Sequence, residues 1–289
     1  MVSGGNNMDK LGIPSNGFEY HRILSDQDIF DEFKKTLEFL NEVFLDRIKK
    51  EAPELANNKL SLHFINYGDT QLVYVFSTGT KRYAVLVGQP ATEMGTVKKE
   101  FANLRMLSEN NQNEIVTPIY YFANNNRELY IAPYIFQSRC IASQDNGWGL
   151  YIPEPHYRFE LFNEEERFLV NSSIIANLVR LYDSKNNCGI GSCKVGGGDF
   201  ILERQWSFEA KTLDNTIKRM KLIAARELIT TSFENYINLL RKEFSIKTYY
   251  SDESEKDKSI LINHKSRIPM TEEEIETGIE LGIKVKKLR

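Results

Sequence analysis

Short apolar runs with strand periodicity dominate the chain between positions 59 and 135. Apolar and polar residues alternate over 60–64, and two further runs rich in β-branched and aromatic residues follow at 72–76 and 83–87. Turn residues separate the three runs, which predicts an antiparallel meander of three strands. Strands joined by such short turns pair with their neighbours in sequence.

One helical segment interrupts these strands. Apolar residues recur there with the spacing of a helix face, at Val97, Phe101, Leu104 and Leu107. Two more strands are predicted at 115–122 and 129–135, joined by a turn of three asparagines. The order β-β-β-α-β-β therefore predicts a five-stranded antiparallel sheet with one helix across it.

The remaining chain favours helices. An amphipathic helix is predicted to begin at Ser25, a second over 163–182 with Asn163 as its cap, and a last one capped by Thr271. The region 216–244 is predicted to be helical, with a division near 230–232. Glycines and prolines over 138–155 predict a loop-rich insertion at a lobe boundary.

The composition is that of an ordinary globular protein: 289 residues, 41% of them hydrophobic, and a formal net charge of −3. The length allows one large domain or two lobes. The charge disfavours a nucleic-acid partner bound mainly through electrostatics. No apolar run approaches the ~20 residues of a membrane span, and no signal-peptide pattern opens the chain.

The three cysteines are sparse, which favours a reducing, cytoplasmic setting. Cys188 and Cys193 lack the spacing of a zinc site, and no matching pair of ligands lies elsewhere. We expect them to be small buried residues.

A glycine-rich stretch is the part of the chain that most suggests a site. The glycines at 196–198 run directly into Asp199 and the apolar residues 200–202, and a second strand-like run at 206–213 ends at Asp214. This predicts a hairpin with a carboxylate at the end of each strand, and carboxylates so placed can hold Mg²⁺. The structural alternative is a glycine turn that Asp199 caps.

The order of elements over positions 60–244 resembles the protein kinase-like fold, including its aminoglycoside phosphotransferase-like branch. The resemblance implies a two-lobed α+β protein, with an antiparallel five-stranded N-lobe carrying one helix and a mainly helical C-lobe. It also implies ATP and Mg²⁺ as cofactors. Four parts are expected. An N-terminal extension with an amphipathic helix covers 1–57, and the N-lobe covers 58–137. The C-lobe with its glycine-rich loop covers 138–250, and a charged loop with a C-terminal helix covers 251–289.

The N-lobe motifs of this family are only partly present. Gly68 lies in the hairpin that would cover nucleotide phosphates, where the family uses several glycines, and it also fits an ordinary turn. The lysine of the third strand is replaced by Leu86, and Glu100 takes the place of the helix glutamate that this lysine would contact. Without the lysine, Glu100 fits an exposed helix position equally well. Backbone groups near Pro133 and Tyr134 would bond a purine.

The catalytic loop fits the family in two registers, and both stay open. In the first, Lys194 takes the lysine position, Ser192 replaces the catalytic aspartate, and Asp199 replaces the metal-binding asparagine. Asp214 would then be the second metal-binding aspartate. A hydroxyl is a poor general base near neutral pH. In the second register Asp199 is the catalytic aspartate, and Glu203 and Arg204 occupy the region of the metal-binding asparagine.

Three functions compete. The first is a degenerate, pseudokinase-like binding or regulatory module that retains nucleotide or has lost it. The second is a divergent ATP- and Mg²⁺-dependent phosphotransferase, in which Lys81, Arg82 or Lys194 supplies positive charge and Asp199 and Asp214 hold the metal. The third is a scaffold without nucleotide. Its contact surfaces would be the N-terminal helix, the basic tail and the aromatic residues of the insertion, namely Trp148, Tyr151, His156 and Tyr157.

The sequence motifs of several other classes of enzyme are absent. The chain has no HExxH, GxSxG or GxxxxGK[ST], and no GxGxxG follows a strand. Zinc proteases, serine hydrolases of that type and dinucleotide enzymes therefore have no support. We expect the chain to act through a protein partner rather than a membrane or a nucleic acid.

Overall fold

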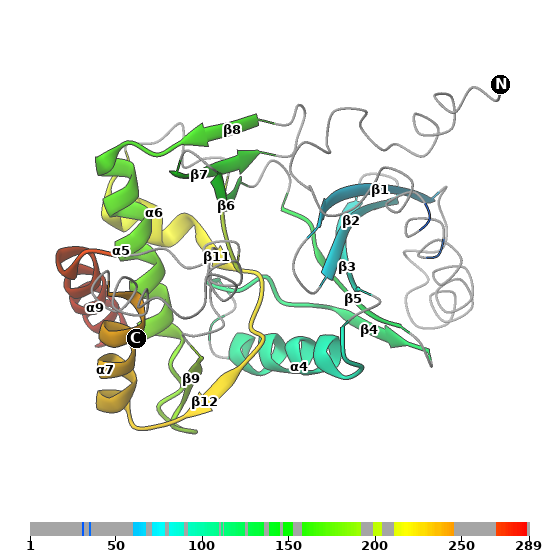
Figure 1. Ribbon diagram of the computed structural model, residues 1–289. Helices are drawn as coiled ribbons and strands as arrows, with labels where there is room; N and C mark the ends of the chain where they lie inside the picture. Colours follow the sequence, from blue (N-terminus) through cyan, green and yellow to red (C-terminus); the bar gives the residue numbers. More distant parts are fainter. Residues whose placement is uncertain are drawn as a thin grey trace, which may run out of the picture. The chain divides into compact units, whose positions relative to one another are not determined.

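The structure is a computed structural model that divides the chain into two compact units (Figure 1). The first unit is Met1–Phe101 with Pro118–Ile135, and the second is Ala102–Thr117 with Phe136–Arg289. The residues described are 31, 35, 60–67, 71–78, 81–89, 92–109, 111, 113–124, 127–135, 139–144, 147–152, 158–191, 199–203, 211–245 and 270–287. The predicted helix from Ser25 lies outside these ranges except for Asp31 and Lys35, which are helical.

The first unit contains a five-stranded antiparallel sheet, as predicted, and the N-terminal part of the predicted helix. The strands pair in the order β1-β2-β3-β5-β4. Their bounds are β1 Leu60–Tyr67, β2 Gln71–Thr78, β3 Lys81–Gly88, β4 Tyr120–Ala123 and β5 Glu128–Pro133, and the helix is α4, Thr96–Ser108. The β-β-β-α-β-β order of the kinase-like α+β fold is therefore confirmed.

The strand predicted over 115–122 begins only at Tyr120. Ile115 instead forms an isolated parallel bridge with Leu222, and both residues belong to the second unit. Its neighbour Glu114 is buried and forms an ion pair with Arg180 of helix α5, Glu164–Leu181. Burial lowers the pKa of Arg180. The segment is thus held by the second unit rather than by the sheet of the first.

The second unit combines helices with a second five-stranded sheet, ordered β11-β10-β6-β7-β8. Its helices are α5 Glu164–Leu181, α6 Leu213–Arg219, α7 Phe233–Phe244 and α9 Glu272–Lys287. Its strands are β6 Arg139–Gln144, β7 Gly147–Ile152, β8 Arg158–Leu161, β9 Cys188–Ile190, β10 Phe200–Leu202, β11 Met220–Leu222 and β12 Leu228–Thr230. The prediction of a loop-rich insertion at 138–155 is wrong, because β6 and β7 lie there.

The predicted helical region 216–244 is only partly helical. Short strands β11 and β12 separate α6 from α7, and α7 begins after its cap Ser232, close to the predicted division. The helix predicted over 163–182 is confirmed as α5. Free Cys188 is buried in β9, as expected of a small structural residue.

Helix α9 packs along α5. A Cβ atom on Gly278 would lie 2.5 Å from the carbonyl oxygen of Ser172, and one on Gly282 would lie 2.7 Å from the Cβ of Val179. The two glycines therefore let the helix backbones approach closely. No helix in the described part of the chain is long and apolar enough to cross a membrane.

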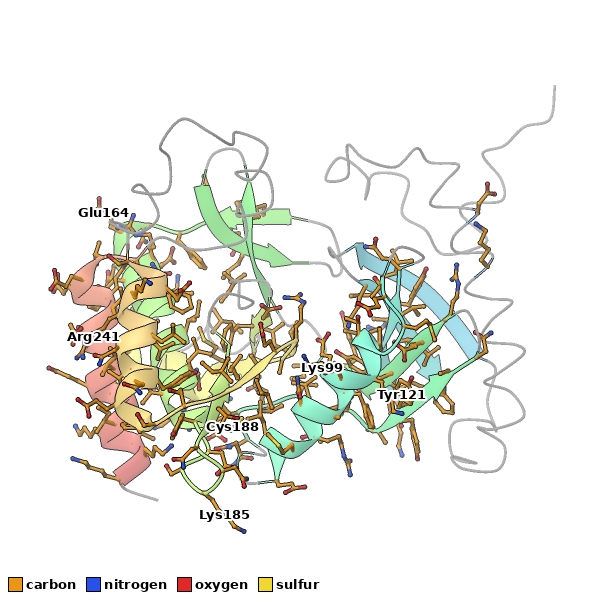
Figure 2. All side chains as sticks on the ribbon, turned by 60° about the horizontal axis from the view of Figure 1, so that its bottom comes forward. Lys99, Tyr121, Glu164, Lys185, Cys188 and Arg241 are labelled. Carbon is orange, nitrogen blue, oxygen red and sulfur yellow. The ribbon has the colours of Figure 1, made fainter. Side chains whose placement is uncertain are left out.

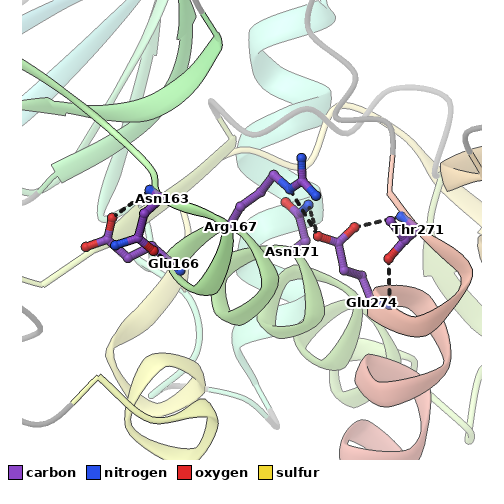
Figure 3. A network of polar contacts seen from close by, with 6 residues as sticks. All are labelled: Asn163, Glu166, Arg167, Asn171, Thr271 and Glu274. Atoms are coloured by element: carbon purple, nitrogen blue, oxygen red, sulfur yellow. Dashed lines mark hydrogen bonds and ion pairs between the residues drawn. The ribbon is translucent and has the colours of Figure 1, made fainter.

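The residues that cap the start of α9 also contact α5 (Figure 3). Thr271 and Glu274 cap α9 reciprocally: the Thr271 N–H donates to Glu274 Oε2 at 2.6 Å, and the Glu274 N–H donates to Thr271 Oγ1 at 3.2 Å. From α5, the Asn171 amide donates to Glu274 Oε1 at 3.0 Å, and Arg167 Nε lies 3.4 Å from the same oxygen. Asn163 caps α5 through a capping box with Glu166, which confirms both predicted caps.

Candidate functional site

Glu100 of α4 is fully buried against the sheet of the first unit. Its Oε2 accepts a hydrogen bond from Gln71 Nε2 at 2.6 Å, and its Oε1 accepts one from the Tyr130 hydroxyl at 3.3 Å. The alternative that Glu100 is an exposed helix residue is therefore wrong. A buried carboxylate needs donors of this kind, because desolvation otherwise makes its charge very costly.

The position predicted to replace the kinase lysine lies on the same face of the sheet. Leu86 of β3 is paired with Tyr130 of β5 and with Val73 of β2. Directly paired residues project to one face, and so does Gln71, two positions before Val73. Leu86 therefore projects to the side where Gln71 and Tyr130 reach Glu100, which agrees with the register inferred from the sequence.

A second carboxylate fixes the start of α4. Glu128 of β5 accepts hydrogen bonds from the N–H groups of Gly95 and Val97 at 2.8 and 3.3 Å, and from the Tyr121 hydroxyl at 2.5 Å. Burial, with the hydrogen bond and negative charge of Glu128, raises the pKa of Tyr121 well above its ordinary value of 10.0. Figure 2 labels Tyr121 on β4, in the sheet that carries Glu128.

The segment expected to contact a purine is partly committed to the sheet. The Tyr134 N–H donates to the Arg82 carbonyl oxygen at 3.2 Å. Pro133 is exposed at the end of β5, and proline carries no N–H to donate. Backbone contacts from Pro133 and Tyr134 to a nucleotide remain a prediction, as does the role of Gly68, which lies outside the described residues.

In the second unit, Asp199 stands directly before β10 and is 3% exposed. Its Oδ1 lies 2.8 Å from Arg226 Nη1. The Asp199 side chain is 4% exposed and the Arg226 side chain 33%, so Asp199 is the buried member of this pair. Both registers inferred for the glycine-rich loop give the Asp199 carboxylate a functional role. In either register, that carboxylate is the one paired with Arg226.

The strand that pairs with β10 is β11, with Phe200 opposite Leu222. The residues after β11 are Ile223, Ala224, Ala225 and Arg226. The predicted hairpin had a carboxylate, Asp214, after its second strand, whereas the first charged residue after β11 is an arginine. The placement of Asp214 at the strand end is wrong. Asp214 is exposed in the first turn of α6, which Thr212 caps by accepting the Asn215 N–H at 3.3 Å.

The two predicted Mg²⁺ ligands, Asp199 and Asp214, lie in different settings. Mg²⁺ takes oxygen ligands at about 2.1 Å and usually keeps several waters. Asp199 is instead buried and paired with a cation, and its predicted partner Asp214 belongs to a helix. No group of three or more His, Cys, Asp or Glu side chains within the described ranges could hold a metal ion. The part played by Lys194 remains a prediction, since this residue is not described.

The sequence reasoning missed two residues of these clusters, Gln71 and Arg226. Gln71 stood just after a predicted turn, and only the pairing of β2 with β3 places it over α4. Arg226 lay in a region expected to be helical. In Met220–Leu222 a lysine stands between two buried apolar residues, and this alternation over three residues is too short to distinguish a strand from a helix.

The element order is that of an α+β protein of kinase-like fold, with an N-terminal antiparallel sheet and helix followed by a helix-rich region. Protein kinase domains are structurally similar to it at low sequence identity. The BubR1 kinase domain is 17% identical with a TM-score of 0.40, covering 60% of this chain and 48% of its own. The autoinhibited serine kinase domain of the giant muscle protein titin is 13% identical with a TM-score of 0.43, covering 82% of this chain and 74% of its own.

The matched part therefore spans about half of the BubR1 chain. No protein-family model and no curated protein matches the sequence.

Proposed function

We propose that this protein is a kinase-like binding or regulatory module that does not catalyse Mg²⁺-dependent phosphoryl transfer. The observation that carries the proposal is the ion pair between buried Asp199 and Arg226. Phosphoryl transfer of the kinase type needs metal ions that bridge the phosphates, and carboxylate or amide oxygens that hold those ions. A guanidinium already neutralises the carboxylate that would serve here.

Two features of the first unit support the same conclusion. Leu86 supplies no charge at the lysine position, and Glu100 accepts hydrogen bonds from the neutral groups of Gln71 and Tyr130. A lysine that holds nucleotide phosphates and is itself held by a glutamate is one of the recurring parts of kinase catalysis. The sheet-facing cluster around Glu100 gives α4 a fixed attachment without it. A protein without these catalytic parts can still bind ligands and partners. The proposal therefore includes binding of a nucleotide and of a protein partner, in a cytoplasmic setting.

The test is a pair of measurements on the full chain. Calorimetric titration with ATP, with Mg²⁺ and with EDTA, measures binding, and release of phosphate or transfer to a generic substrate measures turnover. We expect no turnover above that of Asp199→Ala, and nucleotide binding that does not require Mg²⁺. Asp214→Ala is the matched control, because it removes an exposed carboxylate of the same chemistry from α6.

Two other outcomes would replace the proposal. Turnover of ATP that is lost in Asp199→Ala and kept in Asp214→Ala would establish the divergent phosphotransferase. Absence of nucleotide binding in every condition, together with absence of turnover, would leave the scaffold without nucleotide.

A further inference from the structure

Lys286, in the last turn of α9, places its ammonium group against two aromatic rings of the second unit. Its Nζ lies 4.9 Å from the centroid of the Tyr182 ring and 5.4 Å from that of the Phe233 ring. The same nitrogen donates a hydrogen bond to the carbonyl oxygen of Tyr182, the C-cap of α5, where the helix dipole favours positive charge. Aromatic faces attract a cation in this way. The two rings and the carbonyl oxygen thus form an ammonium site, which Lys286 occupies.

The aromatic rings of this ammonium site are held by contacts that do not involve α9. Tyr182 is 3% exposed, and its hydroxyl donates to the Thr231 carbonyl oxygen at 2.6 Å. Its ring centroid lies 5.1 Å from that of Phe233 and 5.2 Å from that of Tyr236. The Tyr236 hydroxyl in turn donates to the carbonyl oxygen of Ile190 in β9 at 3.2 Å. The rings therefore keep their places when the end of α9 withdraws.

The turn that carries Lys286 is the least buried part of α9. The buried residues of this helix end at Gly282, whereas residues 283–287 are half-buried or exposed. Burial lowers the pKa of Lys286, and the negative charge of Asp183 opposes that effect. The last carbonyl groups of a helix also have no partner within the helix, so its end unwinds most easily. A fixed site is thus filled by a side chain on a part of the helix that can detach.

We propose that the ammonium site binds a lysine side chain of another molecule, and that α9 keeps the site filled with Lys286 until its last turn unwinds. A primary ammonium group fits, because the site offers both ring faces and an acceptor for one of its N–H groups. The supply of that lysine by a protein partner rests on the proposed function. The site itself does not, since it follows from the contacts of Lys286.

The first measurement uses Lys286→Ala, which empties the ammonium site and leaves its rings in place. The probe is Nα-acetyl-lysinamide, and its Nε-acetylated form is the neutral control compound. A ligand at about ten times its Kd raises the melting temperature of a protein of this size by about 2–4 °C. We expect such a shift for Lys286→Ala with the probe alone, at constant ionic strength. Lys284→Ala, which removes an exposed lysine from the same turn, should respond as little as the wild type.

A second variant tests whether the rings bind the probe. Adding Phe233→Leu to Lys286→Ala keeps an apolar side chain but removes one aromatic face, so the shift should be lost. Equal shifts with the probe and the neutral compound in folded Lys286→Ala would overturn the ammonium site. A shift that survives in the double variant would overturn it too.

The second measurement is amide hydrogen exchange of the wild type, followed by mass spectrometry. The probe should speed exchange over residues 283–287, because it displaces Lys286 and frees the last turn of α9, and the neutral compound should not. Exchange that the probe leaves unchanged would overturn the release of α9. This comparison decides the question if Lys286→Ala does not fold, since it needs the wild type alone. Turnover of ATP would reject the proposed function and would leave both of these results unaffected.

Discussion

The Glu128 carboxylate accepts the Gly95 N–H at 2.8 Å, and this contact joins β5 to the start of α4. The first N–H groups of a helix have no partner within the helix, and the helix dipole makes this end favourable for negative charge. Glu128 meets both requirements from a neighbouring strand, while Tyr121 holds its other oxygen. The position of α4, and with it that of Glu100, is therefore set by the sheet.

The change Glu128→Ala should destabilise the fold by about 1–2 kcal/mol, the usual range for a lost cap. The expected loss has two sources, namely the helix N–H groups left without their acceptor and the Tyr121 hydroxyl left without its partner. Denaturant unfolding followed by circular dichroism measures it. The control is Glu109→Ala, which removes an exposed carboxylate just beyond the other end of α4. Equal effects of the two changes would show that Glu128 does not cap the helix.

Replacing Leu86 by lysine tests which face of β3 meets Glu100. A lysine there should be tolerated better than one at Val85, its fully buried neighbour, which projects to the opposite face. Only the lysine at position 86 lies on the side of the buried carboxylate, and an unpaired buried charge is strongly destabilising. Thermal unfolding of Leu86→Lys and Val85→Lys gives the comparison. A larger loss for Leu86→Lys would refute the inferred position of Glu100 relative to this strand.

The substitution Gly278→Ala gives a test by sign. In an exposed helix, alanine in place of glycine stabilises by about 1 kcal/mol. Here the new methyl group would lie 2.5 Å from the Ser172 carbonyl oxygen and 2.7 Å from the Ile175 Cβ, so we expect destabilisation by about 1–3 kcal/mol instead. Glu280→Ala, at an exposed position of the same helix, is the control. A rise in unfolding free energy for Gly278→Ala would mean that α9 does not pack this closely on α5.

The link between α7 and α9 should weaken in acid. Arg241 Nε and Nη2 lie 2.6 and 2.8 Å from the two carboxylate oxygens of Glu276 (Figure 2 labels Arg241). The hydrogen bond from Arg241 lowers the pKa of Glu276 below its ordinary value of 4.5. Because the folded pKa is the lower one, the pair contributes stability above pH 4.5 and loses it as the pH falls through the folded value.

The size of this contribution is small, about 0.2–1 kcal/mol, because the two side chains are 46% and 40% exposed. The measurement is the unfolding free energy of the wild type and of Glu276→Gln. A difference should be present at neutral pH and should vanish below the folded pKa of Glu276. The control is Glu280→Gln, which removes an exposed carboxylate from the same helix and at neutral pH should lower the unfolding free energy less than Glu276→Gln does. A gap that persists in acid would rule out the ion pair as its cause.

The sequence predicted those elements whose signals are local. The apolar alternation, the turn residues and the caps at Asn163 and Thr271 each specify a neighbouring segment, so the first sheet, α5 and α9 were predicted correctly. Strands β6 and β7 were missed because the glycines and prolines over 138–155, Gly149 among them, were interpreted as loop residues. In the structure Gly149 lies in β7, where a Cβ would collide with the backbone of Glu160 in β8. This glycine therefore indicates close contact between two strands.

The sequence could predict those site residues that are identified by their position within one helix or strand. Glu100 and Leu86 were identified from their order along the chain, and the structure places both on one side of the sheet. The contacts of Asp199 were not predictable. Its partner Arg226 follows a three-residue strand that exists because it pairs with β10, and pairing between distant segments leaves no periodic trace in sequence.

The contact between Asn171 and Glu274 joins positions that are 103 residues apart in the chain. Ribosomes add about 5–20 residues per second, so the roughly 100 residues that separate α5 from α9 take about 5–20 s to synthesise. Throughout that interval the face of α5 formed by Ser172, Ile175 and Val179 has no α9 to cover it. Newly made chains should therefore depend on chaperones that shield this face, more than the stability of the finished protein would suggest.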